Sequence, residues 1–319
     1  MRARPGEFEL IAELFAPLTR GAPAALGLQD DAALIRPRAG HELVVTTDGL
    51  VEGVHFLAGD PPDTVARKAL RVNLSDLAAK GAEPIGYFLT LMLPQDRSFA
   101  WIKGFARGLA RDGERFEVPI LGGDTTSTPG PLALSLTAVG TVPRGRMIHR
   151  SGARPGDLVF VSGTIGDAGA GLELAQAAKT RPADLIARYR VPEPRLGLGR
   201  ALRGLASAGL DVSDGLIADL GHIAEVSGVG IVVEAELLPL APAVRRLWRE
   251  EAAVRAAVCG DDYELAFTVP AARRARVIAA AKVVHTPITE IGRVEAGAGV
   301  RLLVQGRPKK LTKRGWRHF

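Results

Sequence analysis

The chain of 319 residues is 47% hydrophobic and 24% charged, a composition typical of about two folded globular domains with aliphatic cores. Its single cysteine, Cys259, excludes an intramolecular disulfide and argues against a zinc cluster. The net charge of +6 is dispersed except for a short basic cluster at Arg307–Arg317, and the sequence lacks a signal-peptide pattern and any apolar run of membrane-spanning length. We therefore expect a cytoplasmic protein with no nucleic-acid or membrane partner.

In the first half of the chain, hydrophobic periodicity predicts helices and strands that follow one another closely. The predicted helices cover residues 7–16, 62–80 and 99–112. The predicted strands cover residues 33–35, 41–46, 88–93, 118–121 and 132–142. The strand at 118–121 leads directly into the polar stretch GGDTTSTPG.

The second half begins after a connector rich in glycine and proline, RSGARPGD at 150–157, where the strand LVFVSG starts. We place the domain boundary at this connector, which gives domains of 1–147 and 148–319. Further on we expect helices at 168–178 and 195–208 and strands near residues 230 and 264. Because strands and helices mix without strict alternation, the pattern favours an α+β fold.

Aspartate repeatedly occurs beside glycine, serine or threonine where an apolar stretch ends. The positions are Asp30 and Asp31, Asp48, Asp76, Asp124, Asp211 and Asp214, and Asp261 and Asp262. Each aspartate taken alone is explained equally well by a turn or a helix N-cap. Asp76 differs, because it lies between Leu74 and Leu77 on an apolar helix, where an unpaired charge is costly.

Several oxygen ligands without histidine or cysteine pairs indicate a hard cation such as Mg²⁺, which is often shared with a phosphate substrate. The chain contains neither a P-loop nor the catalytic motifs of protein kinases. The stretch SGTIGDAGAG at 162–171 does not match the dinucleotide fingerprint, and we interpret it as a turn that leads into a helix.

Six motifs in this order resemble those of the thiamine-monophosphate kinase family. They are TTDGLVEGVHF, VNLSDLAAKGAEP, LGGDTT, RSGARPGD, DVSDGLIADLGH and GDDYEL. That family belongs to the superfamily of aminoimidazole ribonucleotide synthetase and selenophosphate synthetase. The resemblance extends from GEFELI at residue 6 to GWRHF at the C-terminus.

The resemblance implies ATP-dependent phosphorylation of thiamine monophosphate to thiamine diphosphate, the final step of thiamine diphosphate biosynthesis, with several Mg²⁺ ions. It implies an N-terminal Mg²⁺- and ATP-binding domain whose mixed sheet pairs with its twin in a homodimer. The C-terminal α+β domain is then expected to complete the nucleotide and substrate site.

Residue roles follow from the same resemblance. The implied metal ligands are Asp31, Thr46, Thr47, Asp48, Asp76, Asp124, Asp211 and Asp214. The implied nucleotide contacts are Gly123, Asp124, Arg150 and Ser213. The implied substrate contacts are His55, Glu264 and Trp316. Asp48, Asp124 and Arg150 are the implied catalytic residues.

The chain departs from the family pattern at Gln29, where a glycine is usual, at Asp261, where glutamate is usual, and at Phe116, where tyrosine is frequent. Two alternatives stay open: another ATP-dependent enzyme of the superfamily, such as aminoimidazole ribonucleotide synthetase, and a non-catalytic nucleotide-binding scaffold. Selenophosphate synthetase is disfavoured, because no cysteine precedes Cys259.

Overall fold

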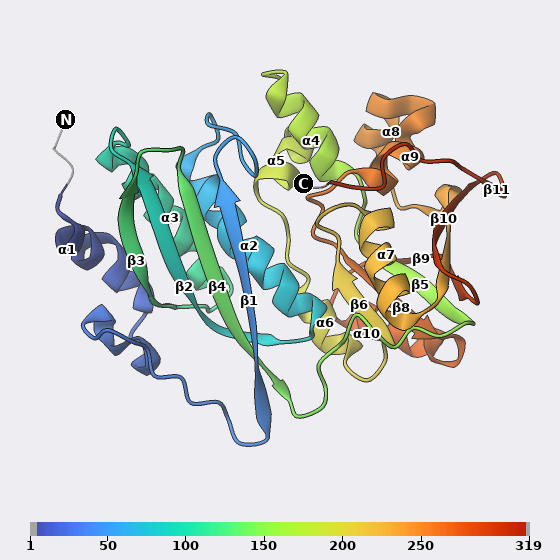
Figure 1. Ribbon diagram of the computed structural model, residues 1–319, viewed down its shortest axis with the longest axis horizontal. Coiled ribbons are helices and arrows are strands. Elements are labelled where there is room, and N and C mark those ends of the chain that lie inside the picture. Colours follow the sequence, from blue (N-terminus) through green and yellow to red (C-terminus); the bar gives the residue numbers. More distant parts are fainter. Residues whose placement is uncertain (1–4, 317–319) are drawn as a thin grey trace. The chain divides into compact units, whose positions relative to one another are not determined.

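The computed structural model describes residues 5–316 and divides into two compact units (Figure 1). The first unit runs to Leu77 and continues over Glu83–Arg144, and the second comprises Ala78–Ala82 and the chain from Gly145 onward. Each unit contains one sheet with both parallel and antiparallel neighbours. The α+β fold predicted from the sequence is therefore confirmed. No helix in the described part of the chain is both long enough and apolar enough to cross a membrane.

The first unit is built on a four-stranded sheet whose strand order is β1-β4-β2-β3. The strands are β1 (His41–Val51), β2 (Glu83–Pro94), β3 (Ile120–Thr128) and β4 (Ala133–Pro143). β2 and β3 pair in parallel, whereas β4 pairs antiparallel with both β1 and β2. The predicted strands at 41–46, 88–93, 118–121 and 132–142 are all present. β3 continues as a strand through Asp124 to Thr128, beyond the predicted end.

Two helices, α2 (Pro62–Ala79) and α3 (Phe99–Arg115), lie on one face of this sheet (Figure 1). They approach closely at Gly108, where a Cβ atom would lie 2.3 Å from the carbonyl oxygen of Asp63. Both helices match their predictions. Between them, the buried Asp112 carboxylate accepts hydrogen bonds from Arg71 and Arg67.

The N-terminal segment is helical, but it changes helix type along its length. α1 (Glu7–Leu10) continues as a π-helical turn, η1 (Ile11–Phe15), and as 3₁₀ turns, η2 (Ala16–Thr19) and η3 (Pro23–Leu28). The predicted strand at 33–35 is wrong. This segment pairs with no strand, and the N–H of Leu34 instead donates to Ala24 of η3.

The second unit contains a seven-stranded sheet of order β11-β10-β7-β9-β5-β8-β6. Its strands are β5 (Asp157–Ser162), β6 (Ala208–Asp211), β7 (Gly230–Glu234), β8 (Leu265–Pro270), β9 (Ile288–Glu295), β10 (Gly299–Val304) and β11 (Arg307–Pro308). Its helices are α4 (Asp167–Gln176), α5 (Ala183–Arg190), α6 (Leu196–Leu202), α7 (Leu216–Ser227), α8 (Pro242–Trp248), α9 (Ala252–Val258) and α10 (Arg274–Val283).

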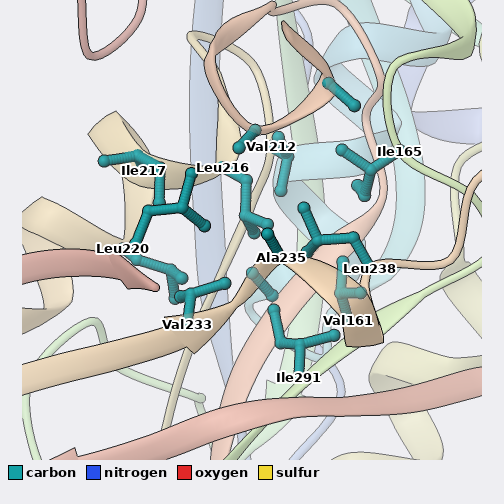
Figure 2. Close-up of a cluster of buried hydrophobic side chains, with 14 of the residues drawn as sticks. Val161, Ile165, Val212, Leu216, Ile217, Leu220, Val233, Ala235, Leu238 and Ile291 are labelled. Atoms are coloured by element: carbon teal, nitrogen blue, oxygen red, sulfur yellow. The ribbon is translucent and has the colours of Figure 1, made fainter. Parts of the chain in front are cut away.

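Helices cover both faces of this sheet. Successive β5 side chains point to opposite faces, and they are apolar on both, so each face packs against helices in its own core. Val159 and Val161 pack in the core that includes α4 and α7, and Figure 2 shows Val161 with its neighbours there. Phe160 packs in the other core, with α6 and α10, and stacks on Phe267 of β8.

The predicted helix at 195–208 is too long, because α6 ends at Leu202 and residues from Ala208 onward form β6. Gly204 lies between the two elements with a φ of 69°, a left-handed conformation that a helix interior does not contain.

Candidate functional site

The polar end of β1 faces α2 through every second residue. Thr46 and Asp48 share a strand face with the buried Val44 and Leu50. On α2, Asp76 is only partly buried, and its Oδ2 accepts a hydrogen bond of 2.5 Å from the Thr46 hydroxyl. Burial, together with the nearby Asp76 charge, raises the pKa of Asp48 to about 6. We call Thr46, Asp48 and Asp76 the β1–α2 acidic group.

The β1–α2 acidic group fits a hard divalent cation. Two half-buried carboxylates repel one another, and their mutual repulsion and desolvation are relieved when a cation binds. Carboxylate and hydroxyl oxygens are the donors that Mg²⁺ accepts from proteins. The sequence indicates that the charge of Asp76 is costly on an apolar helix. In the structure, its carboxylate has a hydrogen-bond partner, Thr46, and a second acid nearby, Asp48.

Thr47 lies on the opposite face of β1 from this group, because consecutive strand residues point to opposite sides. Its exposed hydroxyl accepts a hydrogen bond of 2.9 Å from Thr137 of β4. The structure therefore does not bring the Thr47 side chain together with Asp48 and Asp76.

A second set of predicted residues lines a pocket of about 540 Å³ within the first unit. Asp31, Gly123 and Asp124 lie in its wall, together with apolar side chains that include Phe15 and Leu28. Gly123 has a φ of 152°, and a Cβ atom there would lie 1.9 Å from the carbonyl oxygen of Leu89. Only glycine fits this position, because the β3 backbone lies directly against the Leu89 backbone of β2 there.

The strand order separates Asp124 from the β1–α2 acidic group. Asp48 is on β1 and Asp124 on β3, the two edges of the sheet. Reading across the register, Asp48 pairs with Leu136, which pairs with Leu89, which pairs with Gly123. Three interstrand steps of about 4.8 Å place these positions about 14 Å apart. Within one chain, the first unit therefore contains two separate acidic sites, the β1–α2 acidic group and the pocket with Asp124.

His55 lies in the turn after β1 and is held at two atoms. The backbone N–H of Val51 donates to its Nδ1 at 3.0 Å, and the buried Lys68 of α2 donates to its carbonyl oxygen at 2.9 Å. Because Nδ1 is the acceptor, the neutral ring carries its proton on Nε2. The second ring nitrogen is therefore a hydrogen-bond donor.

In the second unit, Asp211 is the last residue of β6, and Ser213 and Asp214 follow it before α7. We call residues 211–215 the β6–α7 loop. Asp211 is buried, and Ser213 and Asp214 are half-buried. The loop is fastened to a second loop, because Asp261 N–H donates to the Ser213 carbonyl at 2.8 Å.

Two further residues of this region were missed by the sequence reasoning. Asp219 and His222 of α7 lie with Asp214 in a group whose potential ligand atoms are within 4.8 Å of one another. Burial raises the pKa of Asp219 to about 7, although backbone N–H groups of the β6–α7 loop oppose the shift. The spacing of three between Asp219 and His222 places both on one helix face, and that was the available signal.

Glu264, a predicted substrate contact, is fully buried. Its carboxylate accepts hydrogen bonds from Ser162 at 2.5 Å, from Arg188 at 2.8 Å and from Arg195 at 2.5 and 2.7 Å. A Cβ atom at Gly163 would lie 2.1 Å from its Oε1. The side chain is thus occupied by protein partners, two of them arginines that the sequence reasoning did not single out.

The remaining predicted contacts are exposed. Arg150 lies in the segment that precedes β5. Trp316 is 56% exposed, and its backbone N–H donates to the Asp214 carbonyl at 2.9 Å. The proposed aromatic residue is therefore attached to the β6–α7 loop. Residues 317–319 of the GWRHF motif lie outside the described residues.

Two of the departures from the family pattern have a structural context. The Phe116 ring lies under two guanidinium groups, with 5.1 Å from its centroid to Arg71 and 5.0 Å to Arg115. Asp261 adopts a φ of 68°, a left-handed conformation, in the loop before β8. Neither position is among the predicted metal ligands.

Two family models match the chain, one to each half. The model for the N-terminal domain of AIR synthase related proteins matches residues 29–142, and the model for the C-terminal domain matches residues 154–305. Two such domains in this order define a chain of the AIR synthase related class.

Individual relatives narrow the family. Thiamine-monophosphate kinase from Caulobacter vibrioides is 48% identical over 99% of this chain and 92% of the relative. The crystal structure of thiamine-monophosphate kinase from Stenotrophomonas maltophilia superposes with a TM-score of 0.86 at 43% identity, covering 95% of this chain and 98% of that one. A structure of AaThiL complexed with AMPPCP and TMP superposes with a TM-score of 0.79 at 36% identity over the whole of both chains. The chain belongs to the thiamine-monophosphate kinase family.

Proposed function

We propose that this chain transfers the γ-phosphoryl group of ATP to the phosphate of thiamine monophosphate. The proposal is supported by the kinase relatives and by the neighbour complexed with AMPPCP and TMP. The observation that carries it is the β1–α2 acidic group, where Asp48 is desolvated beside Asp76. Such a pair suits a site that gathers cations around phosphates.

These carboxylates would hold Mg²⁺, whose charge would offset the repulsion between the two polyanionic substrates. Thr46, Asp48 and Asp76 would hold one part of this charge, and the pocket residues Asp31 and Asp124 another. Asp211 and Asp214 would hold a third. Thr47 would take part only through its backbone, because its hydroxyl is on the opposite strand face.

The chain's own residues then bind and orient the reactants. The proposed nucleotide contacts are Gly123 and Asp124 in the pocket wall, together with Arg150 and Ser213. The acceptor phosphate oxygen is already ionised at neutral pH, so in-line transfer needs alignment and charge stabilisation rather than a strong base. Arg150 would stabilise the charge that develops during transfer.

His55 and Trp316 are the proposed contacts to thiamine monophosphate. His55 offers its Nε2–H, because Val51 occupies Nδ1. The exposed face of Trp316 suits a cationic thiazolium ring. Glu264 belongs to this set through the arginines that it holds, since its own carboxylate is enclosed.

We also propose that the chain acts as a homodimer through the sheet of its first unit. Leu43 and Val45 of β1 are 43% and 60% exposed on the face opposite α2, which suits burial against a second copy. Sedimentation velocity tests this directly: a Val45→Lys variant is expected to dissociate, and a wild-type chain that sediments as a monomer contradicts the proposal.

Because ATP is the co-substrate, we expect the chain to act in the cytoplasm.

The activity is tested by incubating the purified chain with ATP, Mg²⁺ and thiamine monophosphate and measuring thiamine diphosphate. Asp48→Asn and Asp124→Asn are each expected to abolish product formation while the circular dichroism spectrum and thermal midpoint stay close to wild type. Asp96→Asn, an exposed loop substitution of the same type, is the control and should be fully active. Near-wild-type turnover in either of the first two variants refutes the metal-site assignment.

A further inference from the structure

The backbone just before α7 is held by a side chain of the helix itself. Its first residue is Leu216, and the preceding Gly215 has no side chain with which to cap the free N–H groups. Asp219, in the first turn of the helix, bonds instead to the backbone that precedes the helix. Oδ2 of Asp219 accepts hydrogen bonds from the N–H groups of Asp214 and Gly215, both at 3.0 Å.

The Asp214 peptide is held on its other side by the C-terminal segment. Its carbonyl oxygen accepts the N–H of Trp316 at 2.9 Å. The neighbouring Gly315 packs directly against this turn, since a Cβ atom there would lie 2.5 Å from Cβ of Ala218 and 2.8 Å from the Asp214 carbonyl oxygen. Asp214 is thus bonded to Asp219 through its backbone N–H and to Trp316 through its carbonyl oxygen.

We propose that Asp219 is a positioning residue that fixes the β6–α7 loop, and through it both the Asp214 carboxylate and the Trp316 ring. The functional part of this inference rests on the proposed function, in which Asp214 binds Mg²⁺ and Trp316 contacts the thiamine moiety. Asp219 touches neither reactant in this scheme. It is 4% exposed, and it acts through the two backbone bonds that it accepts.

The geometry separates this role from direct metal ligation by Asp219. Both N–H groups donate to the same carboxylate oxygen, so the single carbonyl oxygen of asparagine can accept both. Alanine can accept neither. A metal ligand would instead lose its charge in the asparagine variant, and its partner His222 would matter as much.

The experiment compares Asp219→Ala, Asp219→Asn and His222→Ala. The first readout is amide hydrogen exchange of the full chain without ATP, Mg²⁺ or thiamine monophosphate. In Asp219→Ala, peptides that cover 212–216 and the C-terminal segment should exchange at least about tenfold faster, while peptides of the β5 core stay unchanged. Asp219→Asn should restore wild-type exchange.

The second readout is kinetic. Asp219→Ala should raise the Mg²⁺ concentration for half-maximal rate and the KM for thiamine monophosphate together, by about 10- to 100-fold, as loss of an outer-shell partner does. Asp219→Asn should recover most of this loss, and His222→Ala should stay near wild type. Asparagine as damaging as alanine, or unchanged exchange in Asp219→Ala, overturns the positioning role. The exchange result stands even if the wild-type chain lacks kinase activity, so the two proposals fail separately.

Discussion

Removing the Glu264 charge tests whether this residue supports the second unit or binds the substrate directly. In Glu264→Gln, the two guanidinium groups of Arg188 and Arg195 lose a carboxylate that is fully buried and that each of them contacts within 2.8 Å. Breaking a buried ion pair from one side costs about 3–5 kcal/mol, because the remaining charge stays desolvated.

The lower end of that range applies here. Both arginine side chains are 20% exposed to solvent, and Arg188 retains its hydrogen bond to the Asp262 carbonyl oxygen in the variant. We therefore expect the free energy of unfolding to fall by about 3 kcal/mol. For a unit of this size the thermal midpoint should drop by roughly 10 °C.

Urea and thermal unfolding, followed by circular dichroism, measure this change. The matched control is Glu290→Gln, which breaks the exposed pair with Arg274 in the same unit and should cost less than about 1 kcal/mol. Kinetics well below the midpoint complete the test. A Glu264→Gln variant of wild-type stability with a greatly raised KM for thiamine monophosphate would refute the structural reasoning and favour a direct substrate contact.

Two further predictions concern buried charges. Burial raises the pKa of Asp262 from 3.8 to about 8, so the folded chain keeps a proton that the unfolded chain has released. The free energy of unfolding should therefore fall as pH rises through this window, by up to about 4 kcal/mol between about pH 5 and pH 8. Urea unfolding measures the difference in free energy of unfolding between wild type and Asp262→Asn. This difference should change in favour of the variant as pH rises across that range. A difference that stays constant, or that changes in favour of wild type, contradicts the assignment. Lys68→Met removes the charged donor to the His55 carbonyl and should raise the KM for thiamine monophosphate roughly tenfold, with little change in the KM for ATP. Lys103→Met on the exposed side of α3 is the control, and equal effects on both substrates would argue against a role through His55.

Most of the secondary structure followed from local patterns. The apolar run at the start of β1 and the apolar stripe of α2 predict both elements, because each pattern depends on residues close in sequence. The strand at 33–35 failed for a complementary reason. Its residues suit a strand, but no neighbouring strand pairs with them, and pairing is a tertiary property.

The sequence by itself also determined the family. Six motifs in order were enough, since each records a local requirement such as an acid after a strand or a glycine in a turn. Asp76 was singled out correctly as a charge in apolar surroundings, and the structure supplies Thr46 as its hydrogen-bond partner.

Only the tertiary structure decided how these residues are grouped. Strand pairing over about ninety positions of sequence places Asp48 and Asp124 at opposite edges of one sheet, and the strand alternation turns Thr47 away from Thr46. Packing around Glu264 encloses a carboxylate that the motif alone suggests is available. These outcomes depend on contacts between distant segments, and no local pattern encodes which segment a side chain will meet.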